Sequence, residues 1–93
     1  MAQPVRPMSS SSRGRVDLVS LVSYMASNLV DQPNEVQVRE IETEDSVILE
    51  VRVASDDMGK VIGRHGRVAR AIRTVTKAIA VRQGKRAMVE IVE

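Results

Sequence analysis

The sequence predicts an α+β fold of one small domain, in which three helices cover one face of a three-stranded sheet. Apolar residues recur with helical spacing near the start of the chain and again in its last third. Between these segments, and at the end of the chain, apolar and polar residues alternate as they do in strands with one buried face. The length of 93 residues suits a single domain and leaves little room for a second.

The composition limits the core and excludes several kinds of site. Hydrophobic residues make up 43% of the chain, but Trp and Phe are absent and there is one Tyr, so the core must be aliphatic. The absence of Cys excludes disulfides, thiol catalysis and cysteine-based zinc sites, and it fits a reducing compartment. Apolar runs are shorter than the ~18 residues that span a bilayer, and the start lacks the apolar stretch of a secretory signal. We therefore expect a cytoplasmic protein.

The chain begins with a segment that predicts a disordered tail. Residues 1–14 contain two prolines and four consecutive serines, without apolar periodicity. We therefore expect the folded domain to occupy residues 15–93.

The first predicted helix covers residues 17–30. Asp17 is suited to cap it, and the segment 31–34, which contains a proline, ends it. Tyr24 lies beside the apolar stripe, so we expect a half-buried ring with its hydroxyl in water. The stripe consists of Leu18, Leu21, Val22, Met25, Ala26, Leu29 and Val30.

Two strands follow this helix. Val36 and Val38 alternate with polar residues, whereas Ile41 breaks the alternation, which predicts a bulge. The short turn at residues 44–46 implies that the two strands form an antiparallel hairpin. One face of the second strand is predicted to be buried and consists of Val47, Leu49, Val51 and Val53.

A brief helix, a glycine turn, a long helix and a strand complete the chain. Ser55 is predicted to cap the brief helix, with Asp56 and Asp57 favourable to its dipole. Gly63 ends the brief helix, and the long helix begins at Gly66 or Arg67 and ends before Gly84. Its predicted inner face consists of Val68, Ala71, Ile72, Val75, Ala78 and Ile79. The strand covers residues 86–92, with Ala87, Val89 and Ile91 on one side and Met88 and Val92 on the other.

The charges divide into an acidic half and a basic half. Residues 15–57 carry three basic and ten acidic side chains, whereas residues 58–89 carry nine basic ones and no acidic one. Such a basic block fits a polyanionic partner if the fold keeps it away from the acidic half. The other interpretation is a solvated helix face that pairs with the acidic half. The nine cations are Lys60, Arg64, Arg67, Arg70, Arg73, Lys77, Arg82, Lys85 and Arg86.

The turn at residues 63–66 has the features of an anion-binding loop. It precedes a long helix, whose first N–H groups lack helical partners and carry partial positive charge. Its glycines allow a sharp turn and remove Cβ atoms that would hold a sugar–phosphate chain away. Arg70, Arg73 and Lys77 share one side of the helix that follows. Near the turn, charge-assisted contacts or hydrogen bonds to an anion are predicted for Lys60, Arg64, His65 and Arg67.

A Gly-x-x-Gly turn alone is weak evidence, because such turns between helices are common. Gly59, Gly63 and Gly66 do not have the spacing of a P-loop or of a dinucleotide-binding turn. His65 is the only histidine, and no carboxylate lies near it in sequence. We find no nucleophile–base pair, so we predict neither an enzyme nor a metal or cofactor site.

Residues 61–66, with the sequence Val-Ile-Gly-Arg-His-Gly, resemble the V-I-G-x-x-G signature of KH domains. A helix and two strands precede this signature, and a basic helix and a strand follow it. This order is similar to the type II KH topology, α-β-β-α-α-β with a mixed three-stranded sheet. The resemblance is to the bacterial KhpA-type family of single-KH proteins, and it covers about residues 16–93. It includes residues 58–63 and the Gly-Lys-Arg segment at residues 84–86.

This resemblance implies binding of about four unpaired RNA nucleotides in a groove. The loop at residues 63–66 would clamp the nucleic-acid backbone. The resemblance also implies self-pairing, a larger Jag-like KhpB protein as partner, and post-transcriptional control or RNA-chaperone activity linked to cell division or envelope growth. The implied apolar walls of the groove are Val61, Ile62, Val68, Ala71 and Ile72, of which Ile72 could instead belong to the core.

Two alternatives remain at this stage. In the first, the chain is an interaction subunit whose basic face meets an acidic protein and which makes little RNA contact of its own. In the second, the two helices around the glycines act as a DNA-reading helix-turn-helix. The absence of aromatic rings argues against an RRM, which needs them for stacking.

Overall fold

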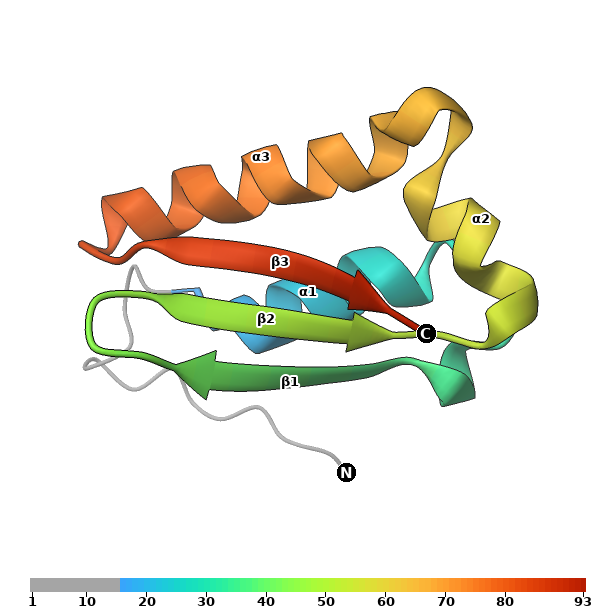
Figure 1. The fold of residues 1–93 in the computed structure, drawn as a ribbon, viewed down its shortest axis with the longest axis horizontal. Coiled ribbons are helices and arrows are strands. Elements are labelled where there is room, and N and C mark those ends of the chain that lie inside the picture. The colour runs from blue at the N-terminus through green and yellow to red at the C-terminus, as the bar shows by residue number, and fades with distance from the viewer. Residues whose placement is uncertain (1–15) are drawn as a thin grey trace.

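The computed structural model describes residues 16–93 and confirms the α+β class (Figure 1). The predicted tail at residues 1–14 lies outside the described residues, as does Arg15. Short 3₁₀ turns occupy Pro33–Glu35, Ser55–Asp57 and Arg64–Gly66. The helices and strands, in chain order, are α1 (Leu18–Ser27), β1 (Gln37–Glu42), β2 (Val47–Arg52), α2 (Met58–Ile62), α3 (Arg67–Arg82) and β3 (Ala87–Val92).

The three strands form one mixed sheet in the order β1-β2-β3. β1 and β2 are antiparallel, as the short turn predicts, and β2 and β3 are parallel. The register of β1 against β2 contains no extra residue, so the predicted bulge at Ile41 is wrong. Ile41 breaks the apolar alternation because it lies opposite Ile48, on the sheet face that points away from the helices. β3 is an edge strand.

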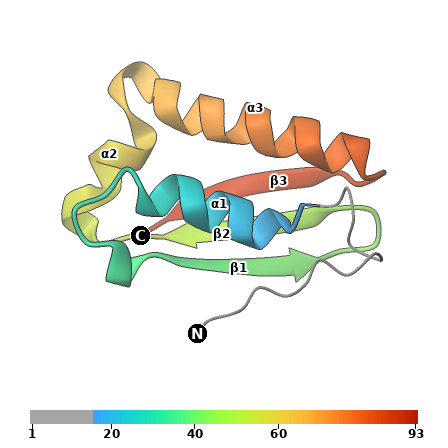
Figure 2. The same cartoon turned by 180° about the vertical axis from the view of Figure 1, so that it is seen from behind.

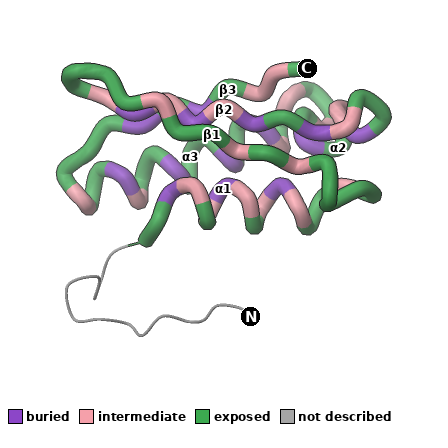
Figure 3. Tube along the Cα trace, turned by 90° about the horizontal axis from the view of Figure 1, so that it is seen from below, coloured by how far each residue is buried: buried purple, intermediate pink, exposed green. Residues whose placement is uncertain are grey.

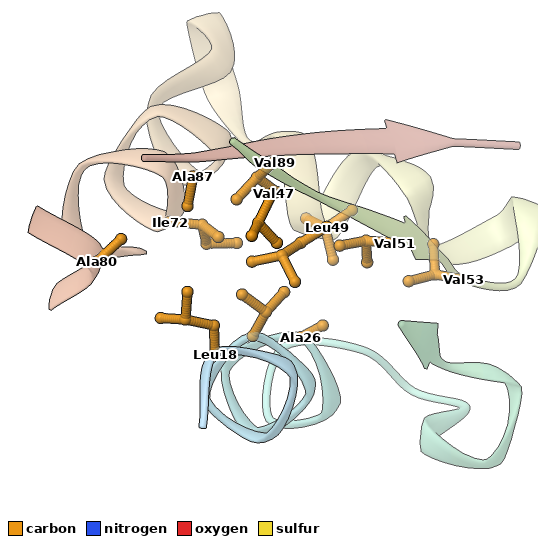
Figure 4. Packing of buried hydrophobic residues seen from close by; sticks show 12 residues of the cluster. Leu18, Ala26, Val47, Leu49, Val51, Val53, Ile72, Ala80, Ala87 and Val89 are labelled. Atoms are coloured by element: carbon orange, nitrogen blue, oxygen red, sulfur yellow. The ribbon is translucent and has the colours of Figure 1, made fainter. Parts of the chain in front are cut away.

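All three helices lie on one side of the sheet, and the other face is open (Figures 2 and 3). The core lies between them and is aliphatic, as the composition predicts (Figure 4). Burying these side chains stabilises the fold by about 25 cal/mol per Å² of apolar surface removed from water. The core cluster consists of Leu18, Val22, Ala26, Val47, Leu49, Val51, Val53, Val61, Ile72, Ala80, Ala87 and Val89.

α1 is shorter than the sequence predicts. The Asp17 carboxylate accepts a hydrogen bond from the Val19 N–H at 3.1 Å, which confirms the predicted cap. At the other end, the Asn28 side chain donates to the Tyr24 carbonyl at 2.8 Å and ends the helix at Ser27. The Tyr24 side chain is 71% exposed rather than half-buried, because it points away from the buried stripe.

α3 faces the core with a different stripe from the predicted one. Ile72 is buried as predicted, but Ala71, Val75 and Ala78 are exposed. Apolar residues lie on two sides of the helix. The side that faces the sheet has small residues at both ends, Ala69 and Ala80. The buried stripe consists of Ala69, Ile72, Thr76 and Ala80. The Thr76 hydroxyl is buried there, and among residues 16–93 it has no hydrogen-bond partner.

Asp57 fixes the start of α2 by a long-range contact. No side chain caps α2 or the 3₁₀ turn before it, so the predicted Ser55 cap is wrong. The Asp57 carboxylate is 1% exposed and accepts hydrogen bonds from the backbone N–H groups of Asp31, at 3.2 Å, and Gln32, at 3.1 Å. A buried carboxylate needs such donors. This contact ties α2 to the connection between α1 and β1.

Candidate nucleic-acid interface

The loop at residues 63–66 joins α2 to α3 at the end of the molecule where β2 and β3 finish (Figure 1). Its backbone turns through three residues with positive φ. Gly63 ends α2 with φ 78° and ψ 170°, and Gly66 precedes α3 with φ 73°. His65, between them, has φ 58°, which makes it the one described non-glycine residue in the left-handed region.

The two glycines are required for different reasons. A Cβ atom at Gly63 would clash with Val68 Cγ2 and lie 2.8 Å from the Val68 backbone nitrogen, so a larger residue fits only if the surrounding backbone shifts. A Cβ atom at Gly66 would meet nothing within 4 Å, so its glycine is favoured by φ alone. Gly63 therefore serves the packing of α3 against the loop. Gly66 serves the turn of the backbone, and the space beside its Cα is open.

Some of the backbone N–H groups of the loop donate to nearby carbonyl groups. Gly63 N–H donates to the Gly59 carbonyl at 2.9 Å, and Gly66 N–H donates to the Gly63 carbonyl at 3.0 Å. Within residues 16–93, the N–H groups of Arg64 and His65 have no backbone acceptor in the turn. The sequence predicts free N–H groups at the turn and at the start of the long helix. In the structure, those of Gly63, Gly66 and Arg67 have backbone acceptors, which leaves the N–H groups of the two tip residues. Both tip side chains are exposed.

Lys60 lies beside carboxylates. Its ammonium is 3.4 Å from the Asp31 carboxylate and 3.6 Å from that of Asp57. The hydrogen bond and the charge of Asp31, with a smaller contribution from Asp57, raise the pKa of Lys60 above its usual 10.5. Its side chain is 43% exposed, so an anion can reach it, but its charge is already partly balanced. Lys60 therefore holds α2 to the preceding connection as well as facing solvent.

The apolar residues predicted to wall the groove occupy different environments. Val61 is fully buried in the core, so it supports the surface from behind. Ile62 is 38% exposed and Val68 is half-buried, so both reach the surface beside the loop. Ile72 is core, and Ala71 is exposed on α3. Ile62 and Val68 are the two that combine apolar character with access at the loop.

The cations that follow the loop share the exposed side of α3. Arg67 and Arg70 are exposed in the first turn, and Lys77 is exposed further along. The Arg73 Nε donates a hydrogen bond to the Val89 carbonyl at 3.2 Å. Because β3 is an edge strand, Arg73 satisfies a backbone group that no neighbouring strand reaches.

These features together form an exposed cationic surface. Exposed N–H groups and cations surround a sharp glycine turn, with apolar side chains beside it. Within residues 16–93, no cluster of three or more potential ligands could hold a metal ion. None of the helices in the same range is long and apolar enough to cross a membrane.

Comparison with known proteins identifies the family. Residues 19–91 match the model of the KH domain of KhpA and KhpB. The chain belongs to the KhpA/KhpB family of KH domains. This is a family of RNA-binding domains rather than enzymes, and the α-β-β-α-α-β order and mixed sheet are those of a type II KH fold.

Curated relatives are similar over most of the chain. The RNA-binding protein KhpA of Clostridium acetobutylicum is 58% identical over 72 residues, which are 77% of this chain and 96% of that protein. KhpA of Aquifex aeolicus is 47% identical over 76 residues, which are 82% of this chain and 96% of that protein. KhpA of Borreliella burgdorferi is 45% identical over 75 residues, 81% of this chain and 92% of that protein.

A crystal structure of Era from Aquifex aeolicus has a similar fold. It matches with a TM-score of 0.60 and 16% identity, over 80% of this chain and 29% of that one. At this identity the match shows the fold alone. The matching part is a minor part of the longer Era chain.

The sequence did not reveal two residues that shape this surface. The role of Asp57 depends on N–H groups 25 and 26 residues away, and no local pattern indicates that contact. Arg73 was grouped with Arg70 and Lys77 by helical spacing, but its bond to Val89 depends on β3 being an edge strand beside α3.

Proposed function

We propose that this chain binds short single-stranded RNA through the loop at residues 63–66 and the apolar surface beside it. The observation that carries this proposal is the exposed tip of the loop. Arg64 and His65 project from a backbone turn of positive φ, and their N–H groups have no acceptor within the described chain. Such a tip matches the Gly-x-x-Gly clamp by which KH domains hold about four nucleotides of backbone.

The neighbouring residues contribute more to RNA binding the more their side chains are exposed to solvent. Arg67 and Arg70 lie in the first turn of α3 and are exposed, so they extend the cationic surface to the next phosphates. Ile62 and Val68 provide apolar contact for a base, while Val61 keeps the surface rigid from within the core. Lys60 contributes less than Arg64, because Asp31 and Asp57 already attract its ammonium.

A substitution at the tip tests the proposal. In the double variant Arg64→Asp, His65→Asp, binding of a fluorescent single-stranded RNA should fall at least tenfold, since hydrogen bonds to charged groups contribute about 1.5–3 kcal/mol each. The unfolding curve should stay close to wild type, because both side chains are exposed. The proposal fails if the folded variant binds RNA as tightly as wild type.

Two further measurements distinguish RNA binding from the two alternatives, a DNA-reading helix-turn-helix and a protein-interaction subunit. Single-stranded RNA should outcompete duplex DNA at equal salt, whereas a helix-turn-helix protein would prefer the duplex. The logarithm of RNA affinity should fall with the logarithm of salt concentration, with a slope of roughly −0.7 per phosphate contacted. A flat salt response would contradict the RNA function and favour an interaction subunit that makes little RNA contact.

At the cellular level, the family membership supports a role for this chain in post-transcriptional control in the cytoplasm. One short site binds weakly, so we propose that affinity is raised by a second module, either another copy of this chain or a larger Jag-like KhpB protein. Linking two such sites raises avidity by about 10²–10⁴ without new contacts. Control of cell division or envelope growth, and RNA-chaperone activity, are the outcomes we propose. Crosslinking and sequencing of bound RNA in cells tests this role.

A further inference from the structure

The outward side of α3 carries a hollow that the loop does not account for. Its volume is about 690 Å³, and it opens on the side of the helix opposite the buried stripe. Four cations and three small or aliphatic side chains line it: Arg70, Arg73, Thr74, Lys77, Ala78, Val81 and Arg82.

We propose that this hollow is a second binding segment for single-stranded RNA, continuing from the loop along α3. The RNA footprint is then longer than the about four nucleotides that one KH groove holds. This inference rests on the proposed function and extends it towards the end of α3 furthest from the loop. Its occupant is the same RNA strand, not a separate ligand.

Among the described residues, no carboxylate neutralises the charges of the hollow, although the Nε of Arg73 donates to the Val89 carbonyl. Within residues 16–93, the ion pairs involve the cations Arg39 and Lys60, and no carboxylate pairs with the cations of the hollow. The acidic side chains of residues 15–57 therefore do not neutralise this surface, as the alternative of a solvated, paired helix face would require. Four cations without a neighbouring anion complement a phosphate chain.

The floor of the hollow suits the bases of such a chain. Val81 is 63% exposed, and Thr74 and Ala78 are also accessible, so aliphatic surface lies between the charged side chains. Proteins that hold single strands combine a cationic track for the backbone with aromatic side chains on which the bases stack, and in this hollow aliphatic side chains take that place. An aliphatic floor contacts every base alike, so the segment contributes affinity without sequence preference.

The hollow begins one helical turn beyond the loop, at Arg70. α3 begins directly after Gly66 and has 16 residues, so at 1.5 Å per residue it is about 24 Å long. In Figure 1 it runs from the loop end to the opposite end of the domain. Arg70, Arg73, Lys77 and Val81 follow one another at helical spacing along the side that the hollow opens on. A strand held at the loop can therefore pass from one cation to the next.

The test compares two unstructured RNAs, one of about four nucleotides and one about twice as long. The double variant Lys77→Gln, Arg82→Gln removes two charges from the hollow, and neither residue belongs to the loop. The matched control Arg39→Gln, Arg52→Gln removes two charges from β1 and β2, away from α3. Fluorescence anisotropy over a salt series gives the affinity and the salt slope for each pair.

We expect wild type and control to bind the longer RNA more tightly and with a steeper salt slope than the shorter one. In the hollow variant, the slope for the longer RNA should become shallower by roughly 0.7 for each phosphate that the protein no longer binds. The hollow variant should then bind the longer RNA more tightly than the shorter one only by the statistical factor that arises because the longer RNA offers more positions at which the loop can bind. Binding of the shorter RNA should stay at the wild-type level.

The inference is overturned if the hollow variant keeps the wild-type slope for the longer RNA while Arg64→Asp, His65→Asp abolishes binding of both RNAs. In that case the proposed function stands and the extension fails. Failure of wild type to bind either RNA overturns both. Competition by polyglutamate as strong as by RNA of equal charge also overturns the inference, because the hollow would then be a general anion surface.

Discussion

Two cations, one within α2 and one just beyond it, lie in opposite environments. Within the helix, Lys60 lies 3.4 Å and 3.6 Å from two carboxylates, one of which is buried and also holds two backbone N–H groups. Just beyond its end, Arg64 is exposed, and among the described residues no carboxylate pairs with it. Both residues belong to the same glycine-rich motif.

This difference separates charge that maintains the fold from charge that is available to a ligand. The Asp57 contact fixes where α2 begins, and so where the loop at residues 63–66 is placed. The loop and the exposed side of α3 can then remain unneutralised without destabilising the core. Substituting the charged residues of the first region should therefore alter stability, and substituting the exposed cations of the second should alter binding, whereas Gly63 acts on the packing of the loop.

The largest effect on stability is expected at Gly63. The variant Gly63→Ala places a Cβ against Val68 and forces a non-glycine residue into a backbone conformation that costs about 1–3 kcal/mol by itself. With overpacking of about 1–3 kcal/mol, the total loss should be about 2–6 kcal/mol. Gly66→Ala has open space and should lose about 1–2 kcal/mol. Urea unfolding of both variants measures the difference, and equal losses would contradict the packing role of Gly63.

Asp57→Asn should come next. An amide is neutral and has one acceptor oxygen, so one of the N–H groups of Asp31 and Gln32 loses its acceptor and the other keeps only an uncharged one. The expected loss is about 1.5–3 kcal/mol in the free energy of unfolding. Asp56→Asn, next to it but exposed, should stay within about 0.5 kcal/mol of wild type. If the two variants are equally stable, the clamp at Asp57 does not hold α2.

Thr76→Val should have a smaller effect of opposite sign. The Thr76 hydroxyl is buried without a partner among residues 16–93, and valine has nearly the same shape. Removing an unsatisfied polar group should stabilise the fold by up to about 1–2 kcal/mol. RNA affinity should not change, because Thr76 lies on the buried side of α3. A loss of stability would show that the hydroxyl has a partner in solution.

The smallest effect is expected at Lys60 and depends on pH. Because its pKa is raised in the folded state, its contribution to stability is fully present below pH 10.5 and is lost as pH rises through the higher folded-state pKa. The difference in melting temperature between wild type and Lys60→Gln should be small and constant near neutral pH and should shrink above pH 10.5. A difference that grows with alkaline pH would contradict the ion pairs with Asp31 and Asp57.

Much of the fold could be predicted from the sequence, because local patterns determine it. The Asp17 cap, the alternation from Val47 to Val53 and the glycine ends of α2 and α3 all act through neighbouring residues. The exceptions depend on tertiary contacts. The buried stripe of α3 is selected by its approach to the sheet, and Ile41 breaks the alternation because its sheet face is open.

The candidate site could also be predicted in part. The loop residues follow from the motif, and their exposure agrees with it. That Val61 is core while Ile62 reaches the surface could not be read from the sequence, since both are aliphatic residues in one turn of helix. The pairing of Lys60 with Asp31, 29 positions earlier in the sequence, also required the fold.

RNA binding by the loop at residues 63–66 is best tested by NMR. Isotope-labelled protein is titrated with short single-stranded RNA, and the backbone amide resonances are followed. We expect the largest shifts at Arg64, His65 and Gly66, smaller ones along the exposed side of α3, and unchanged resonances at Arg39 and Glu50 on the open sheet face. Shifts concentrated on the open face, with the loop resonances unchanged, would contradict RNA binding by the loop.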